Sequence, residues 1–451
     1  MRVTYRSLIA SLAWRVGAFG LVLLLLGAEP ALWPQAPSPG IRTSPIALTG
    51  PLRITRSARI APGTYTIAAP AGGAVIEIAA DGVVLDLTGV TLQAPATEPW
   101  RRHGIGILAQ GHNNITLRGG SVRGYCINAR LADGHGFTVE GGNFSGSRAQ
   151  RLLSTPTHYD EADWVDIFHL AAWQAYGAGL WLQDATQVAI RDTVADAAQN
   201  GIALINVRYA VLSGNEASHN SGWGIALFRS SDNQLWNNHA DWNVRCEAAR
   251  YSHGCDSAGM LLMDGSSRNT LVENTFTHSG DGYFSSKPES GASSDENVVA
   301  YNDGSDSPHN AFESTFSTHD QFIGNVADRS GYGFWLGFSR MTSVTGNQIV
   351  GSHHDGIAIE HGSDNLLLRN RIADSTGAGI RLFRRPGASD PSRNYVVLGN
   401  ILQGNHTGLV VRQSQQVRVI GNQMVNNGNA LDVDRDSSDV LLHGNQVKPG
   451  R

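Results

Sequence analysis

Lysine is almost absent from this sequence of 451 residues: it occurs only at Lys287 and Lys448, and every other basic residue is arginine. The sequence also has no run of basic residues, and its formal net charge is -5 at pH 7. A nucleic-acid-binding surface needs clustered positive charge to neutralise phosphates. The composition therefore argues against nucleic acid as a partner, and it singles out Lys287.

Long apolar runs are also scarce, and the prominent one lies near the N-terminus. Arginines precede the apolar run 16–26, and small residues follow it. This order is typical of a secretory signal peptide, and the run is too short to span a bilayer comfortably. We therefore expect a signal peptide at 1–28. Leu26 suits the position three before the cut poorly, so an uncleaved anchor is the alternative.

Export follows from this reading of the N-terminus. We expect a secreted or periplasmic protein with no stable membrane span after cleavage, a proline-rich linker at 29–50, and one domain at 51–451. Only three cysteines occur, and Cys246 and Cys255 flank one short insertion. In an oxidising compartment they are the natural disulfide pair, which leaves Cys126 buried and free.

The part of the chain after residue 60 lacks a long helical period. Short apolar strands alternate with Gly, Asn and Asp, and from residue 179 a repeat of mostly 22 or 23 residues emerges. A small residue marks each repeat: Gly179, Gly201, Gly224, Gly259, Gly282, Ala311, Gly333, Gly356, Gly379, Gly408 and Ala430. An asparagine recurs late in nearly every repeat: Asn215, Asn238, Asn274, Asn325, Asn347, Asn370, Asn400, Asn422 and Asn445.

One coil per repeat would stack these asparagines into a hydrogen-bonded ladder at the β spacing of about 4.8 Å. Such repeats predict an all-β, single-stranded right-handed parallel β-helix, a solenoid. The pattern Gly356-Ile-Ala-Ile followed by Asn365-Leu-Leu-Leu-Arg-Asn370 resembles the repeats of the pectin-lyase-like superfamily. The resemblance covers about residues 55–447. It implies the fold but no single reaction, because that superfamily includes lyases, hydrolases, epimerases and non-catalytic proteins.

Side chains alternate along a strand, so one outward column can be followed from repeat to repeat. It is apolar near residue 205 and changes to acidic, aromatic and basic side chains between 281 and 385. Insertions at 147–175 and 244–256 precede the strand, and insertions at 288–295 and 384–393 follow it. We expect these loops to wall a groove, with residues 157–169 as a short helix at its edge.

A groove across stacked coils suits an extended polysaccharide. The candidate substrate-binding residues are Phe284, Trp335, Arg381, Phe383, Asp281 and His309. Phe284, Trp335 and Phe383 are expected to be exposed platforms for sugar rings.

Two candidate reactions follow from the charged residues of this groove. In the first, Glu313 and Glu360, with backbones about 10 to 12 Å apart by strand geometry, act as the carboxylate pair of a glycoside hydrolase. Asp355 and Asp281 are alternative partners. This reaction requires no cofactor, and it is slightly favoured.

The rival reaction is elimination from a uronic acid by a polysaccharide lyase. Lys287 or a histidine, such as His354 or His361, would be the base, and Arg381 or a Ca²⁺ held by Asp281 and Glu313 would neutralise the substrate carboxylate. The resemblance implies Lys or Arg bases beside acidic Ca²⁺ sites, but no Lys and Arg lie one coil apart in matching columns.

A different class of function stays open beside these enzymes. A non-catalytic carbohydrate-binding or surface protein would keep the aromatic platforms and tolerate loss of the carboxylates. A periplasmic accessory protein would instead take up a metal through the histidines, although the sequence names no metal ligand set. The sequence leaves the sugar, its linkage and the oligomeric state undetermined.

Overall fold

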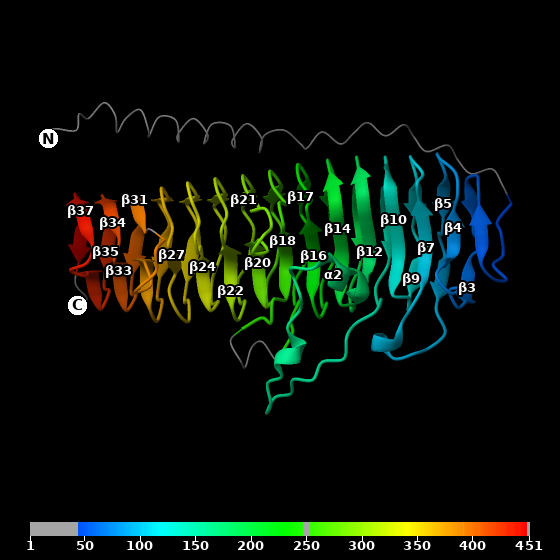
Figure 1. The fold of residues 1–451 in the computed structure, drawn as a ribbon, viewed down its shortest axis with the longest axis horizontal. Coiled ribbons are helices and arrows are strands. Elements are labelled where there is room, and N and C mark those ends of the chain that lie inside the picture. Colours follow the sequence, from blue (N-terminus) through cyan, green and yellow to red (C-terminus); the bar gives the residue numbers. More distant parts are fainter. Residues whose placement is uncertain (1–43, 247–252, 391, 449–451) are drawn as a thin grey trace. The chain divides into compact units, whose positions relative to one another are not determined.

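The computed structural model describes residues 44–246, 253–390 and 392–448. In this part of the chain, short parallel strands stack coil upon coil from β4 to β37 (Figure 1). The structure is the right-handed parallel β-helix that the repeat predicts. The expected signal peptide, 1–28, lies outside the described residues.

The first sheet carries the column of polar residues and has 15 strands, all paired in parallel with their neighbours. In order across the sheet they are β1 (Leu52–Ile54), β4 (Ala74–Ile78), β7 (Ile105–Gln110), β10 (Ile127–His135), β12 (Ala178–Thr186), β14 (Asn200–Arg208), β16 (Trp223–Phe228), β18 (Ala258–Met263), β20 (Asp281–Ser286), β22 (Asn310–Ser314), β24 (Tyr332–Trp335), β27 (Ile357–Glu360), β30 (Ala378–Phe383), β33 (Thr407–Arg412) and β36 (Asn429–Val433).

Two further sheets close each coil. The second contains β2 (Ala58–Arg59), β5 (Val84–Asp86), β8 (Thr116–Arg118), β11 (Thr138–Asn143), β13 (Ala189–Val194), β15 (Val211–Ser213), β17 (Gln234–Trp236), β19 (Thr270–Val272), β21 (Val298–Ala300), β23 (Gln321–Ile323), β25 (Ser343–Thr345), β28 (Leu366–Leu368), β31 (Arg393–Leu398), β34 (Gln415–Ile420) and β37 (Ser438–His443). The second sheet also includes β3 (Gly63–Thr66), β6 (Val90–Gln93) and β9 (Ser121–Arg123). The third has five strands, β26 (Gln348–Val350), β29 (Arg371–Ala373), β32 (Ile401–Gln403), β35 (Gln423–Val425) and β38 (Gln446–Lys448).

Inward side chains of all three sheets form one continuous apolar core, and the predicted asparagine ladder borders it. Asn238 Nδ2 donates to Asn274 Oδ1 over 2.9 Å, and the same bond links each ladder residue to the next from Asn215 to Asn445. Asn302, which sequence indexing passes over, fills the step between Asn274 and Asn325. The ladder gives every coil the same height and so fixes which outer side chains become neighbours.

The described residues contain three short helical segments, η1 (Pro99–Arg101), η2 (Glu161–Asp163) and α2 (Leu170–Tyr176). The helix expected at 157–169 is therefore misplaced: that range holds only the 3-10 turn η2, and the α-helix begins at Leu170. The helix forms later because Trp173 and Tyr176, one turn apart, bury their rings against the sheet.

The solenoid begins earlier than the expected boundary at residue 51. Ile46 donates its backbone N–H to Arg59 O over 2.9 Å, and Leu48 is buried in the core. These two residues of the range assigned to a linker belong to the first coil. No helix within the described ranges is long and apolar enough to cross a membrane.

Candidate active site

The outer face of the first sheet has the register that the sequence predicts. Phe284 pairs with Glu313, Glu313 with Trp335, Trp335 with Ala358, and Ala358 with Arg381. These side chains therefore form one outward row across β20, β22, β24, β27 and β30. Neighbouring members are about 4.8 Å apart in backbone position.

The row is not open along its whole length, and Phe284 is not the exposed platform that was expected. Its exposed fraction is 6%, because it joins an apolar cluster on the outside of the sheet that includes Trp173 and Tyr176 of α2. The register gave the direction of Phe284 correctly. It did not show that the insertion before β12 folds back over this part of the sheet.

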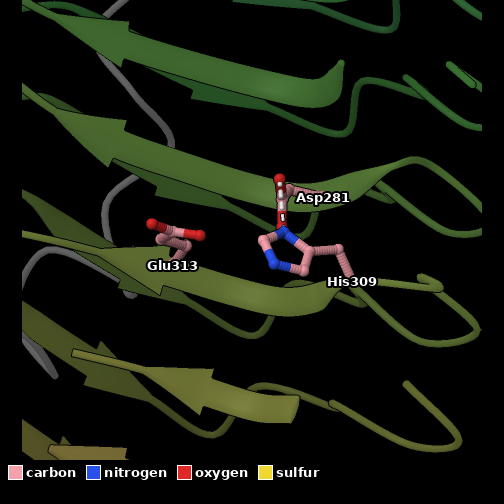
Figure 2. A group of neighbouring side chains, drawn as sticks. All are labelled: Asp281, His309 and Glu313. Carbon is pink, nitrogen blue, oxygen red and sulfur yellow. Dashed lines mark hydrogen bonds and ion pairs between the residues drawn. The ribbon is translucent and has the colours of Figure 1, made fainter. Parts of the chain in front are cut away.

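Beyond this cover, Asp281 of β20 meets His309 and Glu313 at β22 (Figure 2). The Asp281 carboxylate lies 3.0 Å from His309 Nδ1 and accepts hydrogen bonds from the backbone N–H of Asn310, at 3.0 Å, and its Nδ2, at 2.9 Å. Asn310 Nδ2 also donates to Glu313 Oε2 over 2.6 Å. Asp281 and Asn310 are buried, whereas His309 and Glu313 remain partly exposed. We call Asp281, His309, Asn310 and Glu313 the acidic cluster.

Interactions within the acidic cluster shift the pKa values of Glu313 and His309. Burial raises the pKa of Glu313, the nearby Asp281 carboxylate raises it further, and together they bring it to about 8. Burial alone would lower the pKa of His309, but the Asp281 carboxylate outweighs burial and raises it to about 9. At neutral pH, Glu313 is therefore mostly protonated, and His309 is a cation paired with Asp281.

Asp256 is a further member of this electrostatic neighbourhood, and it comes from the insertion before β18. Burial raises its pKa to about 7, and the Asp281 carboxylate acts in the same direction. Asp256 in turn raises the pKa of Glu313. Two carboxyl groups with pKa values near neutrality thus interact here, a pattern more typical of acid–base sites than of surface acids.

The acidic cluster is also where the described residues could share a cation. Asp281, His309 and Glu313 each offer one ligand atom, and these atoms lie within 4.8 Å of one another. Their present contacts are hydrogen bonds and an ion pair among themselves and with Asn310.

Next to Glu313 along the sheet lies a depression of about 400 Å³, whose lining includes Tyr332, Trp335, His354, Asp355 and Arg381. Trp335 is half-buried and packs edge-on against Tyr332 and Phe383. Arg381 Nε lies 2.6 Å from Asp355 Oδ2, so its positive charge is already paired. The His354 ring lies 4.9 Å from that of Tyr332.

Glu360 does not join Glu313. It is buried, its Oε1 lies 2.7 Å from Arg385 Nε and 3.3 Å from His361 Nε2, and it does not contribute to the shifted pKa of Glu313. The loop after β30 supplies Arg385 and draws Glu360 into an ion pair at the other end of the strand. The expected pairing of Glu313 with Glu360 is therefore wrong.

Lys287 likewise lies away from the acidic cluster. It lines a separate depression of about 650 Å³ together with Phe316, Phe338 and Arg340, and its Nζ lies 5.7 Å from the centre of the Phe316 ring. Lys287 follows the last residue of β20, whereas Asp281 is the first residue of that strand. The length of the strand separates the two residues.

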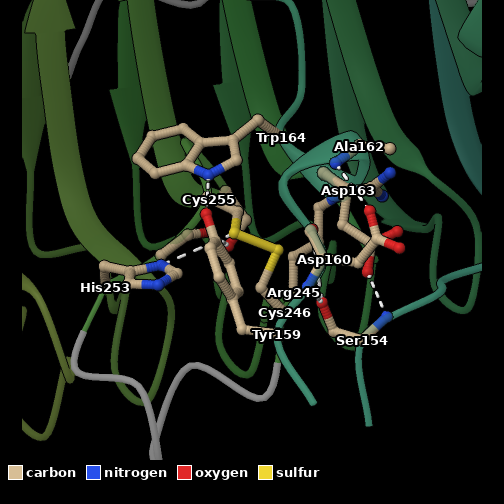
Figure 3. Close-up of a disulfide and its surroundings, with 12 residues drawn as sticks. Ser154, Tyr159, Asp160, Ala162, Asp163, Trp164, Arg245, Cys246, His253 and Cys255 are labelled. Carbon is tan, nitrogen blue, oxygen red and sulfur yellow. Dashed lines mark hydrogen bonds between the residues drawn. A yellow bond between two sulfur atoms is a disulfide. The ribbon is translucent and has the colours of Figure 1, made fainter.

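The predicted disulfide between Cys246 and Cys255 is confirmed, with a Cα–Cα distance of 6.1 Å (Figure 3). Cys126 is free, as expected, but only partly buried. The disulfide closes the loop that carries His253, and Asp256 follows this loop directly.

Sequence reasoning missed Asp256 and Asn310 as site residues. Asp256 directly follows Cys255, and the insertion 244–256 was expected to form a wall. Asn310 precedes the small residue of its repeat, at the position of Asp281, Tyr332 and Asp355. The position of Asn310 in that column was the available signal, but the selection of candidates favoured charged side chains and passed over this asparagine.

Comparison with known families agrees with the fold. Residues 298–447 match a family model described as the right handed beta helix region, and residues 89–289 match one described as periplasmic copper-binding protein (NosD). The chain is a right-handed parallel β-helix protein.

Several solved structures are similar over most of their length. The A-module of mannuronan C-5 epimerase AlgE6 from Azotobacter vinelandii is 14% identical, with 88% of this chain and 92% of that chain covered and a TM-score of 0.47. PfbA, a surface adhesin of Streptococcus pneumoniae, is 12% identical, with 73% of this chain and 85% of that chain covered and a TM-score of 0.40. The catalytic domain of a GH87 alpha-1,3-glucanase in complex with nigerose is 13% identical, with 93% of this chain and 70% of that chain covered and a TM-score of 0.42. No curated protein matches the chain.

Proposed function

We propose that this protein is an exported, carbohydrate-active β-helix enzyme that cleaves a polysaccharide on the outer face of its first sheet, by glycoside hydrolysis. The observation that carries the proposal is Glu313, a partly exposed carboxyl group whose pKa is raised to about 8 and whose strand pairing places it beside Trp335, a lining residue of the depression. The signal-like N-terminus and the match to a periplasmic family support export.

Glu313 is the proposed general acid. Asn310 donates to Glu313 Oε2, which leaves Oε1 to hold the proton and pass it to the glycosidic oxygen. Buried Asp281 holds His309 through Nδ1, so that this imidazolium lies beside Glu313 and stabilises the carboxylate that forms as the proton leaves. The acid is thus neutral before proton transfer and supported afterwards.

Asp256 is the proposed second carboxyl group, acting as base or nucleophile from the wall. Its pKa of about 7 is lower than that of Glu313, about 8, so a window exists in which Asp256 is ionised while Glu313 keeps its proton. Two carboxyl groups in opposite protonation states are what glycoside hydrolysis requires.

Elimination from a uronic acid fits this groove less well. Lys287, the lysine proposed as the base, lies in the separate depression, and His309 is protonated at neutral pH, so neither is placed as a base beside Glu313. Arg381 is held by Asp355 and would have to exchange that partner for a substrate carboxylate. The proposed hydrolysis requires no cofactor. Ca²⁺ bridging Asp281 and Glu313 is the alternative that a chelator tests.

A periplasmic metal-binding accessory protein is the second candidate, because the matched family is described as copper-binding. The acidic cluster offers one imidazole and two carboxylates, a set harder than the thiolate and thioether ligands that select Cu(I). Titration of the purified protein with Cu(I) and Cu(II) separates the candidates. Tight copper binding that is lost in His309→Ala, without glycan cleavage, would favour the accessory role.

The test of the enzyme is a screen of purified protein on neutral and uronic-acid polysaccharides, reading reducing ends and absorbance near 235 nm together, with and without EDTA. Reducing ends without absorbance, lost in Glu313→Gln and Asp256→Asn and unaffected by EDTA, are expected. Absorbance that disappears with EDTA would support a calcium-dependent lyase. A silent wild type that is still retarded in polysaccharide gels would support a binding protein.

A further inference from the structure

Two insertions that are distant in sequence meet in one aromatic wall (Figure 3). Trp164 follows η2 in the first insertion, and its ring stacks on His253 of the disulfide-closed insertion, with ring centres 5.5 Å apart and an angle of 21°. Tyr159 meets the same imidazole edge-on, at 4.7 Å, and accepts a hydrogen bond from Trp164 Nε1. With 42% of its surface exposed, Trp164 leaves much of its ring uncovered.

The aromatic wall, Tyr159, Trp164 and His253, is held from behind by buried polar contacts. Asp163 accepts hydrogen bonds from the backbone N–H groups of Leu153 and Ser154, and Arg245 donates to the carbonyl oxygen of Asp163. The backbone N–H of Val165 donates to Cys255 O over 3.2 Å and joins the two insertions directly. Trp164 is therefore displayed on a fixed support, which lowers the entropy lost when a ligand stacks on it.

The aromatic wall stands beside the acidic cluster. Cys255 O accepts from Val165, next to Trp164, and two residues later Ser257 O accepts from the backbone N–H of Asp281 over 2.9 Å. A sugar ring stacked on Trp164 would therefore belong to the same glycan whose bond lies at Glu313.

The charges around this position select against an anionic glycan. Asp256 and Asp281 lie near Glu313, which is mostly protonated at neutral pH, and the wall segment adds Asp160, Glu161 and Asp166. Of the cations near them, His309 is paired with Asp281 and His169 with Asp166, while Arg245 is buried behind the wall. A uronic acid would bring a carboxylate to this acidic wall segment, where Asp281 and Asp166 already pair with His309 and His169, whereas a neutral sugar has no such cost.

We infer that Trp164, with Tyr159 and His253 behind it, forms a sugar-binding subsite that takes a neutral hexose or pentose unit of the polysaccharide. This inference rests on the proposed function for the reaction at Glu313, and it adds both the platform and the substrate class. Aromatic faces bind the apolar face of a sugar ring through burial of C–H groups, and they need no charge.

The test measures binding separately from cleavage, in a Glu313→Gln background. Retardation in native gels containing β-glucan, xylan, galactomannan or dextran gives the affinity for neutral chains, and gels with alginate or polygalacturonate give that for anionic ones. We expect retardation by at least one neutral chain only, a loss of at least tenfold in affinity with Trp164→Ala, and recovery of most of it with Trp164→Phe. Trp100→Ala is the matched control, because Trp100 is also partly exposed, at 36%, but its ring packs against Arg151 and not on the His253 imidazole.

Several outcomes would overturn the inference: stronger retardation by the anionic chains, no retardation in any gel, or equal binding by Trp164→Ala and Trp100→Ala variants. Matching thermal unfolding of the variants excludes misfolding as the cause of lost binding. A neutral glycan that is bound through Trp164 but left intact by the wild type would refute the proposed hydrolysis and leave the subsite standing. If Trp164→Ala in the otherwise wild-type protein cleaves a neutral glycan at the wild-type rate, the subsite is refuted and the proposed hydrolysis stands.

Discussion

At the scale of single residues, the acidic cluster depends on which group holds a proton. Asp281 raises the pKa of both Glu313 and His309, and His309 lowers those of Glu313 and Asp256. Because Glu313, His309 and Asp256 shift one another's pKa values, the pH dependence of activity reports these groups together and not one residue alone.

The first prediction concerns the pH profile of kcat/KM on a polysaccharide substrate. The acidic limb should lie near pH 7, where Asp256 ionises, and the alkaline limb near pH 8, where Glu313 loses its proton. His309→Asn removes a positive charge that lowers both pKa values, so both limbs should move to higher pH. His319→Asn, an exposed histidine before β23, is the control. Limbs that stay in place in His309→Asn would contradict the electrostatic account.

The second prediction concerns Asp320, a buried acid where a row of hydrogen-bonded asparagines, Asn233, Asn269 and Asn297, continues. Burial raises its pKa from 3.8 to about 7. The unfolded chain therefore releases this proton at lower pH than the native protein, and stability should fall as pH rises from about 4 to 7 and then level off. A shift of about three pKa units corresponds to roughly 4 kcal/mol.

Asp320→Asn removes this titration while keeping the shape of the side chain. Denaturant unfolding at pH 5 and pH 8 should show a smaller pH-dependent loss than in the wild type, and higher stability than the wild type at pH 8. An unchanged pH dependence would show that Asp320 is not the group responsible.

Residue-scale prediction from sequence succeeded where the repeat fixed the direction of a side chain. Glu313 and Trp335 lie in one outward row because strand alternation and the repeat length determine that row. The sequence did not predict the pairing of Glu360 with Arg385 or the contribution of Asp256, because both depend on how irregular loops fold back. Periodicity carries no information on loop conformation.

At the scale of elements, the strands are interchangeable and the insertions are not. The coils from Asn215 to Asn445 contribute the same ladder position, whereas Trp164 and His253, from two different insertions, meet beside the acidic cluster. Stability should therefore depend on the ladder, and substrate handling on the insertions.

The third prediction concerns the ladder. Asn274→Ala would remove the acceptor of the backbone N–H and of one Nδ2 N–H of Asn238, and the Nδ2 donor to Leu235 O, all of them buried. Unsatisfied buried groups cost about 1 to 3 kcal/mol each, so a loss of roughly 2 to 5 kcal/mol in the free energy of unfolding is expected. Chemical denaturation measures it. A loss below 1 kcal/mol would mean that water replaces the missing amide.

The fourth prediction concerns the disulfide. Replacing Cys246 and Cys255 together by serine frees a loop with a sequence separation of 9. Stability should fall by about 2 to 3 kcal/mol from lost loop constraint. Because His253 and Asp256 lose their anchor, kcat/KM should fall at least tenfold while far-ultraviolet circular dichroism stays that of a β protein. An unchanged kcat/KM would show that the disulfide-closed insertion does not contribute to the reaction.

At the scale of the whole molecule, the solenoid is a nearly one-dimensional stack in which each coil contacts its neighbours. Such a scaffold is predictable from sequence because its period, its small residues and its asparagine column all repeat, and the structure agrees with each of them. The site occurs once, where coils and insertions differ from the repeat. The outward row of residues on the first sheet could be predicted from the repeat, but the parts of the site that the insertions form could not.

The central claim is that Glu313, and not Glu360, is the acid of a polysaccharide hydrolase. The most direct measurement is the rate of release of reducing ends from a neutral polysaccharide by the wild type, Glu313→Gln and Glu360→Gln at pH 7.5. The account predicts a loss of at least a thousandfold for Glu313→Gln, because the proton donor is removed, and a rate within tenfold of the wild type for Glu360→Gln. Equal losses in the two variants, or an active Glu313→Gln variant, would contradict it.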